Sequence, residues 1–164
     1  MKQKFVLAFM CLLFSVAGQA QHARHMDFLG IPIDGTLQSF ESKLPAKGFK
    51  KVVWKGEILW EGTFLNEAVR LQMLTDNRTG KVSSVVLATQ KESSGQDILG
   101  EVERWKSKIG KFYHASFYTR DNGFYAADIQ SPSGRVGVGC LYIDASSDSY
   151  VVMILIIDGE NARL

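Results

Sequence analysis

Few residues in this chain have the types and spacing that acid–base chemistry requires. His114 is the one histidine outside the N-terminal segment, and Asp121 and Asp128 follow it in a predicted turn and strand. A histidine oriented by a carboxylate is the base of many hydrolases, but it must activate a nucleophile, such as a serine in a sharp strand-to-helix turn. No serine or cysteine of this sequence has that context. A hydrolase is therefore the least favoured of three functional hypotheses, and no catalytic residue is assigned.

The remaining histidines do not predict a metal site. His22 and His25 are three residues apart, whereas a zinc site in a protein needs three or four convergent ligands. No nearby cysteine or carboxylate cluster completes such a set. We therefore expect residues 21–26 to form an N-terminal tail, and we expect neither a metal nor a cofactor. Cys140 has no neighbouring histidine that would lower the pKa of its thiol, so it is not a candidate nucleophile.

Aromatic side chains offer a second kind of chemistry, because an exposed ring gives a flat apolar surface on which a sugar or another small ligand can lie. The candidates are Trp54, Trp60, Tyr113 and Tyr125. The predicted strands also need aromatic residues for their core. A carrier of a small ligand or carbohydrate is therefore the alternative rather than the leading hypothesis.

The N-terminus has the features of a secretory signal peptide. Two lysines precede an apolar run over residues 5–17, and Gly18 and Ala20 place small residues where signal peptidase requires them. The run is much shorter than the ~20 residues that cross a bilayer. Cys11 lies in its middle, whereas a lipid anchor would need a cysteine at its end. We expect cleavage after Ala20 and export to the periplasm or the extracellular space, without a stable membrane anchor.

The mature chain would carry no net charge. The sequence has 19 lysines and arginines against 17 acidic residues, and cleavage would remove two lysines and no acid, which leaves 17 of each. Nucleic acids and anionic membranes attract a concentrated basic excess, so neither is an expected partner. The 144 residues after the cleavage site suffice for one domain with a sizeable core. Their single cysteine cannot form an intrachain disulfide.

The clearest local signal is the stretch over residues 27–49, which leads from a loop into a helix. Thr36 stands where an N-cap hydroxyl would accept a backbone N–H. A predicted buried stripe follows at helical spacing and consists of Leu37, Phe40 and Leu44. Gly48 suits the left-handed residue that ends a helix. Pro45 removes a backbone hydrogen bond, so we expect a kink or an early end near Leu44.

The next segment reads as an antiparallel meander. Apolar and polar residues alternate over residues 58–65, 68–74 and 82–89, with a turn cluster at residues 76–80. Such alternation indicates strands that are covered on one side only. Residues 50–54 would add a weaker strand.

A second amphipathic helix is predicted over residues 97–109. Its buried stripe would contain Ile98, Val102, Trp105 and Ile109, and Gly110 is the expected cap. Four further strands are expected over residues 112–119, 124–130, 135–143 and 150–157. Gly137 and Gly139 share one strand face, and this would let a large side chain, for which Trp105 is the candidate, lie flat on the sheet.

The last predicted strand, YVVMILII, is apolar on both faces. A strand of this kind is either central with cover on both sides or half of a contact between molecules. A homodimer is therefore one of the expected assemblies.

The two halves of the chain resemble each other. Similar helix ends open them, SKLPAKGF and ERWKSKIGKF, and similar turn-plus-strand segments close them, TDNRTGKVSSVVL and DASSDSYVVMILI. This similarity predicts a degenerate tandem repeat. The predicted fold is α+β, with helix-plus-antiparallel-meander repeats whose helices pack on one face of a curved antiparallel sheet. After the signal peptide (1–20) and the tail (21–26), residues 27–164 form a single domain, with halves at about 27–90 and 91–160.

The segments DFLGIPIDGTLQSFESKLPAKGF and EGTFLNEAVRLQMLTDNRTGKVSSVVL resemble small secreted bacterial proteins of unknown function. The predicted architecture is similar to the β-lactamase-inhibitor-protein-like repeat fold. This resemblance implies a curved sheet whose concave face binds a protein. Members of the inhibitor family often carry a disulfide in each repeat, which Cys140 alone cannot supply, and no functional residue carries over by motif.

Strand alternation predicts a binding surface on the sheet face away from both helices. The candidate residues are Glu61, Thr63, Arg70, Gln72 and, with them, Ser83. An arginine, an acid and small hydroxyls next to aromatic residues resemble an interface more than a solubilising face. The leading hypothesis is an exported, non-enzymatic protein that binds another protein, or an envelope or host polymer, through this face.

Overall fold

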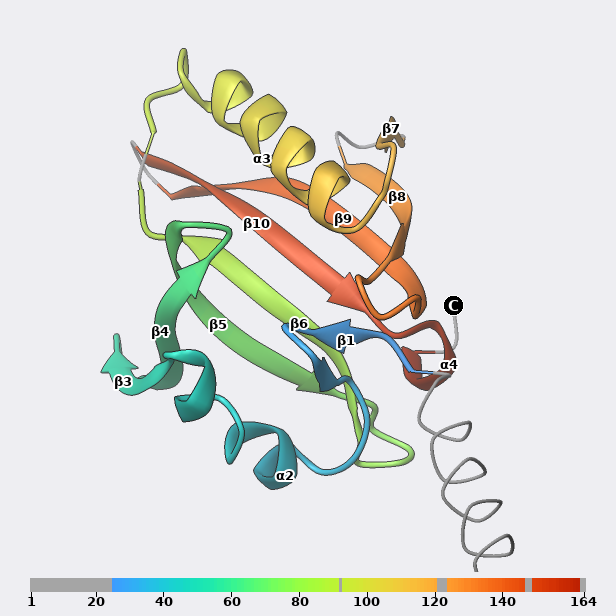
Figure 1. Cartoon of the computed structure of the whole chain (residues 1–164). Helices are drawn as coiled ribbons and strands as arrows, with labels where there is room; N and C mark the ends of the chain where they lie inside the picture. Colours follow the sequence, from blue (N-terminus) through green and yellow to red (C-terminus); the bar gives the residue numbers. More distant parts are fainter. Residues whose placement is uncertain (1–24, 92, 121–123, 147–148, 163–164) are drawn as a thin grey trace, which may run out of the picture.

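The computed structural model describes residues 25–91, 93–120, 124–146 and 149–162. The predicted signal peptide and the first four residues of the predicted tail lie outside this part of the chain. Antiparallel strands contain more of the described residues than the helices do, and α3 lies along the large sheet (Figure 1). The fold class is α+β, as the sequence predicted.

The large sheet has eight antiparallel strands in the order β3-β4-β5-β6-β10-β9-β8-β7. Its strands are β3 (Lys50–Trp54), β4 (Glu57–Phe64), β5 (Glu67–Thr75), β6 (Val82–Thr89), β7 (Tyr118–Thr119), β8 (Tyr125–Gln130), β9 (Val136–Ser146) and β10 (Ser149–Ile157). A small sheet pairs β1 (Asp27–Phe28) with β2 (Ile31–Pro32). The helical elements are α2 (Leu37–Glu41), the 3-10 turn η1 (Pro45–Lys47), α3 (Ile98–Phe112) and α4 (Gly159–Ala162).

The first helix begins where the sequence predicted and ends earlier than its apolar stripe suggests. Thr36 is the N-cap, and its hydroxyl accepts a hydrogen bond from the Ser39 N–H at 3.2 Å. The α-helix ends at Glu41, and Pro45 then opens η1, where its missing N–H is not needed. Leu37 was expected on the buried stripe, but its side chain is 39% exposed. Leu37 is the first residue of a helix of only five residues, in which Phe40 alone is buried.

The end of this helical segment was predicted correctly. Gly48 has a positive φ of 85°, and the Phe49 N–H returns to the Leu44 carbonyl at 3.2 Å. This geometry folds Phe49 back into the interior, where its side chain is 1% exposed. Phe49 lies against Gly62 of β4, so the cap joins the helical segment to the sheet.

The second helix, α3, buries the predicted stripe but ends later than predicted. Ile98, Val102 and Trp105 are all buried. Gly110 is not its cap, because α3 continues to Phe112. The glycine has another role: a Cβ atom at position 110 would stand 2.7 Å from the Ala115 carbonyl oxygen. The chain packs back so closely there that only glycine fits.

The late end of α3 also corrects the predicted strand over residues 112–119. Only Tyr118 and Thr119 pair with a neighbouring strand, β8. His114 has a positive φ of 49° just after the helix, which is incompatible with a strand. The other strands lie where the alternation placed them, with small shifts at their ends.

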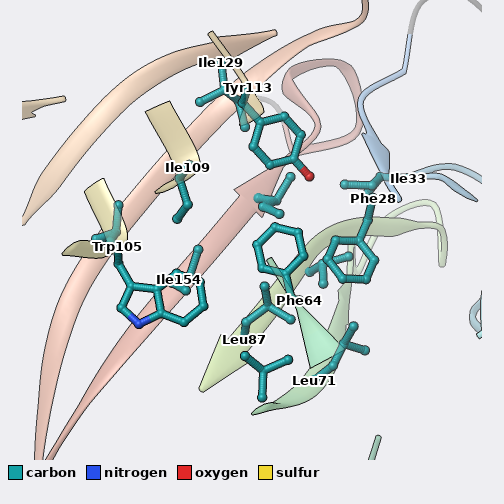
Figure 2. Packing of buried hydrophobic residues seen from close by; sticks show 14 of the residues in the cluster. Phe28, Ile33, Phe64, Leu71, Leu87, Trp105, Ile109, Tyr113, Ile129 and Ile154 are labelled. Carbon is teal, nitrogen blue, oxygen red and sulfur yellow. The ribbon is translucent and has the colours of Figure 1, made fainter. Parts of the chain in front are cut away.

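The hydrophobic core lies between the helices and one face of the sheet. Figure 2 shows Trp105 and Ile109 of α3 near Phe64, Leu87 and Ile154 of the sheet. Phe64 and Trp105 stack with ring centroids 6.4 Å apart and planes within 8°. Phe40 and Leu44, from the first helical segment, belong to the same buried cluster.

The N-terminal tail predicted over residues 21–26 is wrong at its end. Met26 is fully buried, and its N–H donates to the Asp158 carboxylate at 2.6 Å. The preceding residue, His25, contacts the same carboxylate through Nδ1 at 2.9 Å. These contacts fix the start of the fold beside β10.

The space above Gly137 and Gly139 is filled by residues other than Trp105. A Cβ atom at Gly137 would meet the Ile157 carbonyl oxygen at 2.5 Å and Met26 Cγ at 2.9 Å. At Gly139 it would meet Ile129 Cγ2 at 2.9 Å. The prediction that these glycines receive the indole ring is therefore corrected.

The apolar strand β10 is central, between β6 and β9. Its residues Val152, Ile154 and Ile156 belong to the core. The alternate residues of the same strand are only partly covered, and they are Val151, Met153, Leu155 and Ile157. One of the two faces therefore remains open to contact.

Candidate functional site

The strand register places the four predicted site residues on the sheet face opposite the core. Glu61 lies opposite Arg70, Thr63 opposite Ala68, and Gln72 opposite Val86. Their neighbours along each strand, such as Leu71, point into the core. We call this surface the open face, defined by Glu61, Thr63, Arg70, Gln72, Val86, Ala88, Val151 and Met153.

The central polar contact of the open face is the ion pair between Glu61 and Arg70. Arg70 Nε donates to Glu61 Oε1 at 2.9 Å, and the two side chains are 27% and 35% exposed. Cross-strand pairs of opposite charge hold both side chains in one place at small energetic gain. The contact therefore positions Arg70 more than it stabilises the fold.

A groove of about 290 Å³ hollows the open face beside Arg70. Its apolar floor comes from neighbouring strands and consists of Leu59, Val86, Ala88, Val151 and Met153. Its polar and charged lining consists of Lys55, Glu57, Arg70, Gln72, Thr89, Gln90 and Asp144. Arg70 and Gln72 were predicted members of a site. The others were missed because they converge from six neighbouring strands, several of them far apart in the sequence.

Trp54 also lines this groove. The Arg70 guanidinium carbon lies 4.6 Å from the centroid of the indole ring, and Lys55 Nζ lies 4.4 Å from it. Lys55 is held in place by the β3–β4 turn, where it has a positive φ of 50°. Leu59, which belongs to the groove floor, is 8% exposed. Two cations therefore meet at one aromatic ring.

Ser83 does not belong to the open face. The β5–β6 register shifts at Leu74 and Thr75, and Ser84 rather than Ser83 pairs with Leu74. Ser83 is 8% exposed and donates a hydrogen bond to the Leu74 carbonyl at 3.3 Å. Ser83 alternates with Val86 and Ala88 and has the parity of the buried Val85 and Leu87, so its predicted place beside the other four residues is wrong.

Of the four aromatic residues considered for a small-ligand carrier, Trp54 alone lines the groove. Trp60 is buried, and its Nε1 donates to Glu41 Oε1 at 3.2 Å. Tyr113 is fully buried, and burial raises the pKa of its phenol. Tyr125 is partly covered, with Lys106 Nζ 4.6 Å from its ring centroid. These three serve the core and its border.

Two of the residues considered for a hydrolase, His114 and Asp128, lie in the described part of the chain. Asp121 lies outside the described residues. His114 is exposed after the end of α3, and no hydrogen bond in the described part of the chain joins it to Asp128. Burial raises the pKa of the Cys140 thiol, which makes it a poorer nucleophile.

Two buried polar clusters were not found from the sequence. In the first, the Asp158 carboxylate binds His25 and the Met26 N–H, as described above, and Asp34 lies 3.7 Å from the other His25 nitrogen. In the second, Asp27 accepts hydrogen bonds from Ser131 at 2.7 Å and from Ser133. The first cluster joins the residues before β1 to Asp158, directly after β10, and the second joins β1 to the β8–β9 turn, so both serve the fold.

Neither a protein family nor a curated protein nor a solved structure matches this chain. Within the residues that the structure describes, no helix is long and apolar enough to cross a membrane. No group of three or more histidine, cysteine or acidic side chains in the same residues is arranged to hold a metal ion.

Proposed function

We propose that this protein is an exported, non-enzymatic binding protein whose partner docks on the open face. The groove beside Trp54 and Arg70 is the single observation that carries the proposal. It combines a partly exposed tryptophan, an arginine stacked on it and an apolar floor, and Trp and Arg are the residues that most often dominate binding energy at protein interfaces.

The composition of the open face supports a protein partner. Val151 and Met153 of β10 lie at the centre of the open face, and Glu61, Gln72 and Asp144 lie around them. Protein interfaces share this arrangement of an apolar centre and a polar rim. Glu61, Thr63, Arg70 and Gln72 remain the proposed contact residues. Arg70 and Gln72 line the groove, and Glu61 supports Arg70.

The strand order supports the proposed tandem repeat. Four strands follow the first helical segment, four follow α3, and the last strand of each set meets the other at the centre as β6 and β10. Such an order is expected for two similar units that pair through their final strands. We propose the β-lactamase-inhibitor-protein-like arrangement on this basis, with export directed by residues 1–20.

The proposal is tested by site-specific photo-crosslinking in the cells that produce the protein. A photoreactive amino acid at Gln72, on the open face, should yield a defined adduct with a protein partner. The same residue at Leu99, which is 60% exposed on α3, is the matched control and should yield none. Adding Arg70→Ala and Glu61→Ala should weaken the adduct at Gln72. A defined adduct at Leu99 alone would place the partner on the helical side and contradict the proposal.

Trp54 supports a second candidate, a carrier of a small ligand or carbohydrate. Its ring is 38% exposed at the mouth of the groove. A groove of about 290 Å³ lies at the lower limit of ordinary ligand pockets. A glycan array probed with the protein, beside a Trp54→Ala variant, tests this alternative.

A further inference from the structure

Arg70 uses only part of its hydrogen-bonding capacity. Its Nε donates to Glu61, and its terminal Nη groups have no hydrogen-bond partner among the described residues. Arg104 provides a comparison within the same chain, because it binds the carboxylates of both Glu67 and Glu101 through Nε and both Nη groups. Arg70 lines the groove, so its two Nη groups can serve as donors to a second carboxylate there.

Lys55 adds a second free donor at the same place. Its ammonium lies over the Trp54 ring on which the Arg70 guanidinium also rests. No carboxylate lies within ion-pair distance of Lys55 in the described part of the chain. A guanidinium and an ammonium around one indole form a positive centre, and such a centre attracts an anion.

The surface next to this centre is aliphatic. In the register, Arg70 lies opposite Ala88, and Ala88 lies opposite Met153. Val86 and Val151 extend the same floor. The groove has the size of one or two side chains rather than of a large cofactor. An anion bound to Arg70 would therefore have an apolar group directly beside it.

We propose that the groove takes an acidic side chain of the partner protein, with an aliphatic side chain of the same segment resting on the floor. The carboxylate binds the two Nη groups of Arg70, and Lys55 lies beside it. Glu57 and Asp144 also line the groove, so they disfavour a segment with several acids in a row. This inference rests on the proposed function, because it names the chemistry that the open face recognises.

A pair of short peptides tests the inference. Acetyl-Leu-Glu-Leu-amide and acetyl-Leu-Gln-Leu-amide differ by one charge and are nearly equal in size. Each is titrated into the protein, expressed from its full-length chain, while backbone amide shifts are recorded by NMR. The glutamate peptide should bind about tenfold more tightly, as expected for a charge-assisted hydrogen-bonded pair. The shifts should centre on Arg70, Gln72, Val86 and Ala88.

Three variants distinguish the effect of the planar Arg70 guanidinium from the effect of positive charge alone. Arg70→Lys keeps the charge but loses the planar fork, so the affinity for the glutamate peptide should fall about tenfold. Lys55→Ala removes an exposed side chain and should weaken binding by a smaller factor. Arg78→Gln, in the exposed β5–β6 turn, removes one positive charge away from the groove and should leave the affinity unchanged. Thermal unfolding of each variant shows that the fold is intact.

The outcomes distinguish this inference from the proposed function. Equal affinity for both peptides, with shifts on the open face, would overturn the carboxylate assignment and leave the binding face in place. An unchanged affinity in both Arg70→Lys and Lys55→Ala would do the same. Shifts confined to α3, or no binding of either peptide together with no photo-adduct at Gln72, would overturn both.

Discussion

The ring of Phe49 lies against the backbone of Gly62 so closely that a Cβ atom at position 62 would stand 2.6 Å from Phe49 Cδ1. The ring cannot move away freely, because Phe28 packs against it with its centroid 5.9 Å away. The helical cap at Gly48 and the second strand of the sheet are thus joined through one aromatic contact. Glycine is required at position 62 for packing, not for its backbone angles.

The substitution Gly62→Ala should lower the free energy of unfolding by about 1–3 kcal/mol, the usual cost of an overpacked core. Urea denaturation measures the change. Gly100→Ala is the matched control, since nothing lies within 4 Å of a Cβ atom there. Because position 100 lies within α3, Gly100→Ala should raise the free energy of unfolding by about 0.5–1 kcal/mol. Equal effects of the two changes would show that Phe49 does not confine position 62.

Replacing Trp105 with alanine should cost about 3–5 kcal/mol, because the indole is fully buried and stacks on Phe64. Phe40→Ala, in the first helical segment, should cost a similar amount. Leu99→Ala changes an exposed position of α3 and should alter the free energy of unfolding by no more than about 0.5 kcal/mol. A melting temperature that Trp105→Ala leaves unchanged would refute the assignment of the α3 stripe to the core.

Stability toward acid should depend on Glu67. Hydrogen bonds from Lys108 and Arg104 lower the pKa of this carboxyl below its ordinary value of 4.5. A lowered pKa stabilises the folded state above about pH 4.5, and this contribution is lost as the pH falls from there through the folded-state pKa. Glu67→Gln should therefore flatten the fall in melting temperature below that pH.

The control for Glu67 is Glu103→Gln, on α3. Glu103 pairs with Lys106 at 2.8 Å but is 65% exposed, so its loss should change little. The melting temperatures of the two variants and the parent protein are compared from about pH 7 to about pH 3. A parent-like acid profile for Glu67→Gln would assign the acid sensitivity to other carboxylates.

Processing of the N-terminus should leave a chain that begins at Gln21. The basic start, the apolar run and the small residues at positions 18 and 20 motivate this expectation. Intact mass spectrometry of the protein recovered from the producing cells measures the result. A full-length or lipid-modified mass in the exported fraction would contradict cleavage after Ala20.

The sequence by itself determined the local elements. Period-two alternation located β4, β5 and β6, because each strand is buried on one side only and its neighbours lie nearby in the chain. Thr36 and Gly48 marked the ends of the first helical segment through local hydrogen bonds and backbone angles. Alternation also placed Glu61 and Arg70 on the same face, whereas the register that sets them opposite each other was decided by the structure.

The tertiary structure decided what depends on distant contacts. Gly110 looked like a cap, but α3 continues past it to Phe112, and the Ala115 carbonyl oxygen packs where a Cβ atom would stand. Met26 looked like part of a tail, but Asp158, far away in sequence, fixes it in the core. The stack of Trp54 on Arg70 joins β3 to β5 across β4, so it depends on how the side chains pack in the folded sheet. Periodicity shows which face a residue occupies, whereas packing sets the distance between two residues on that face.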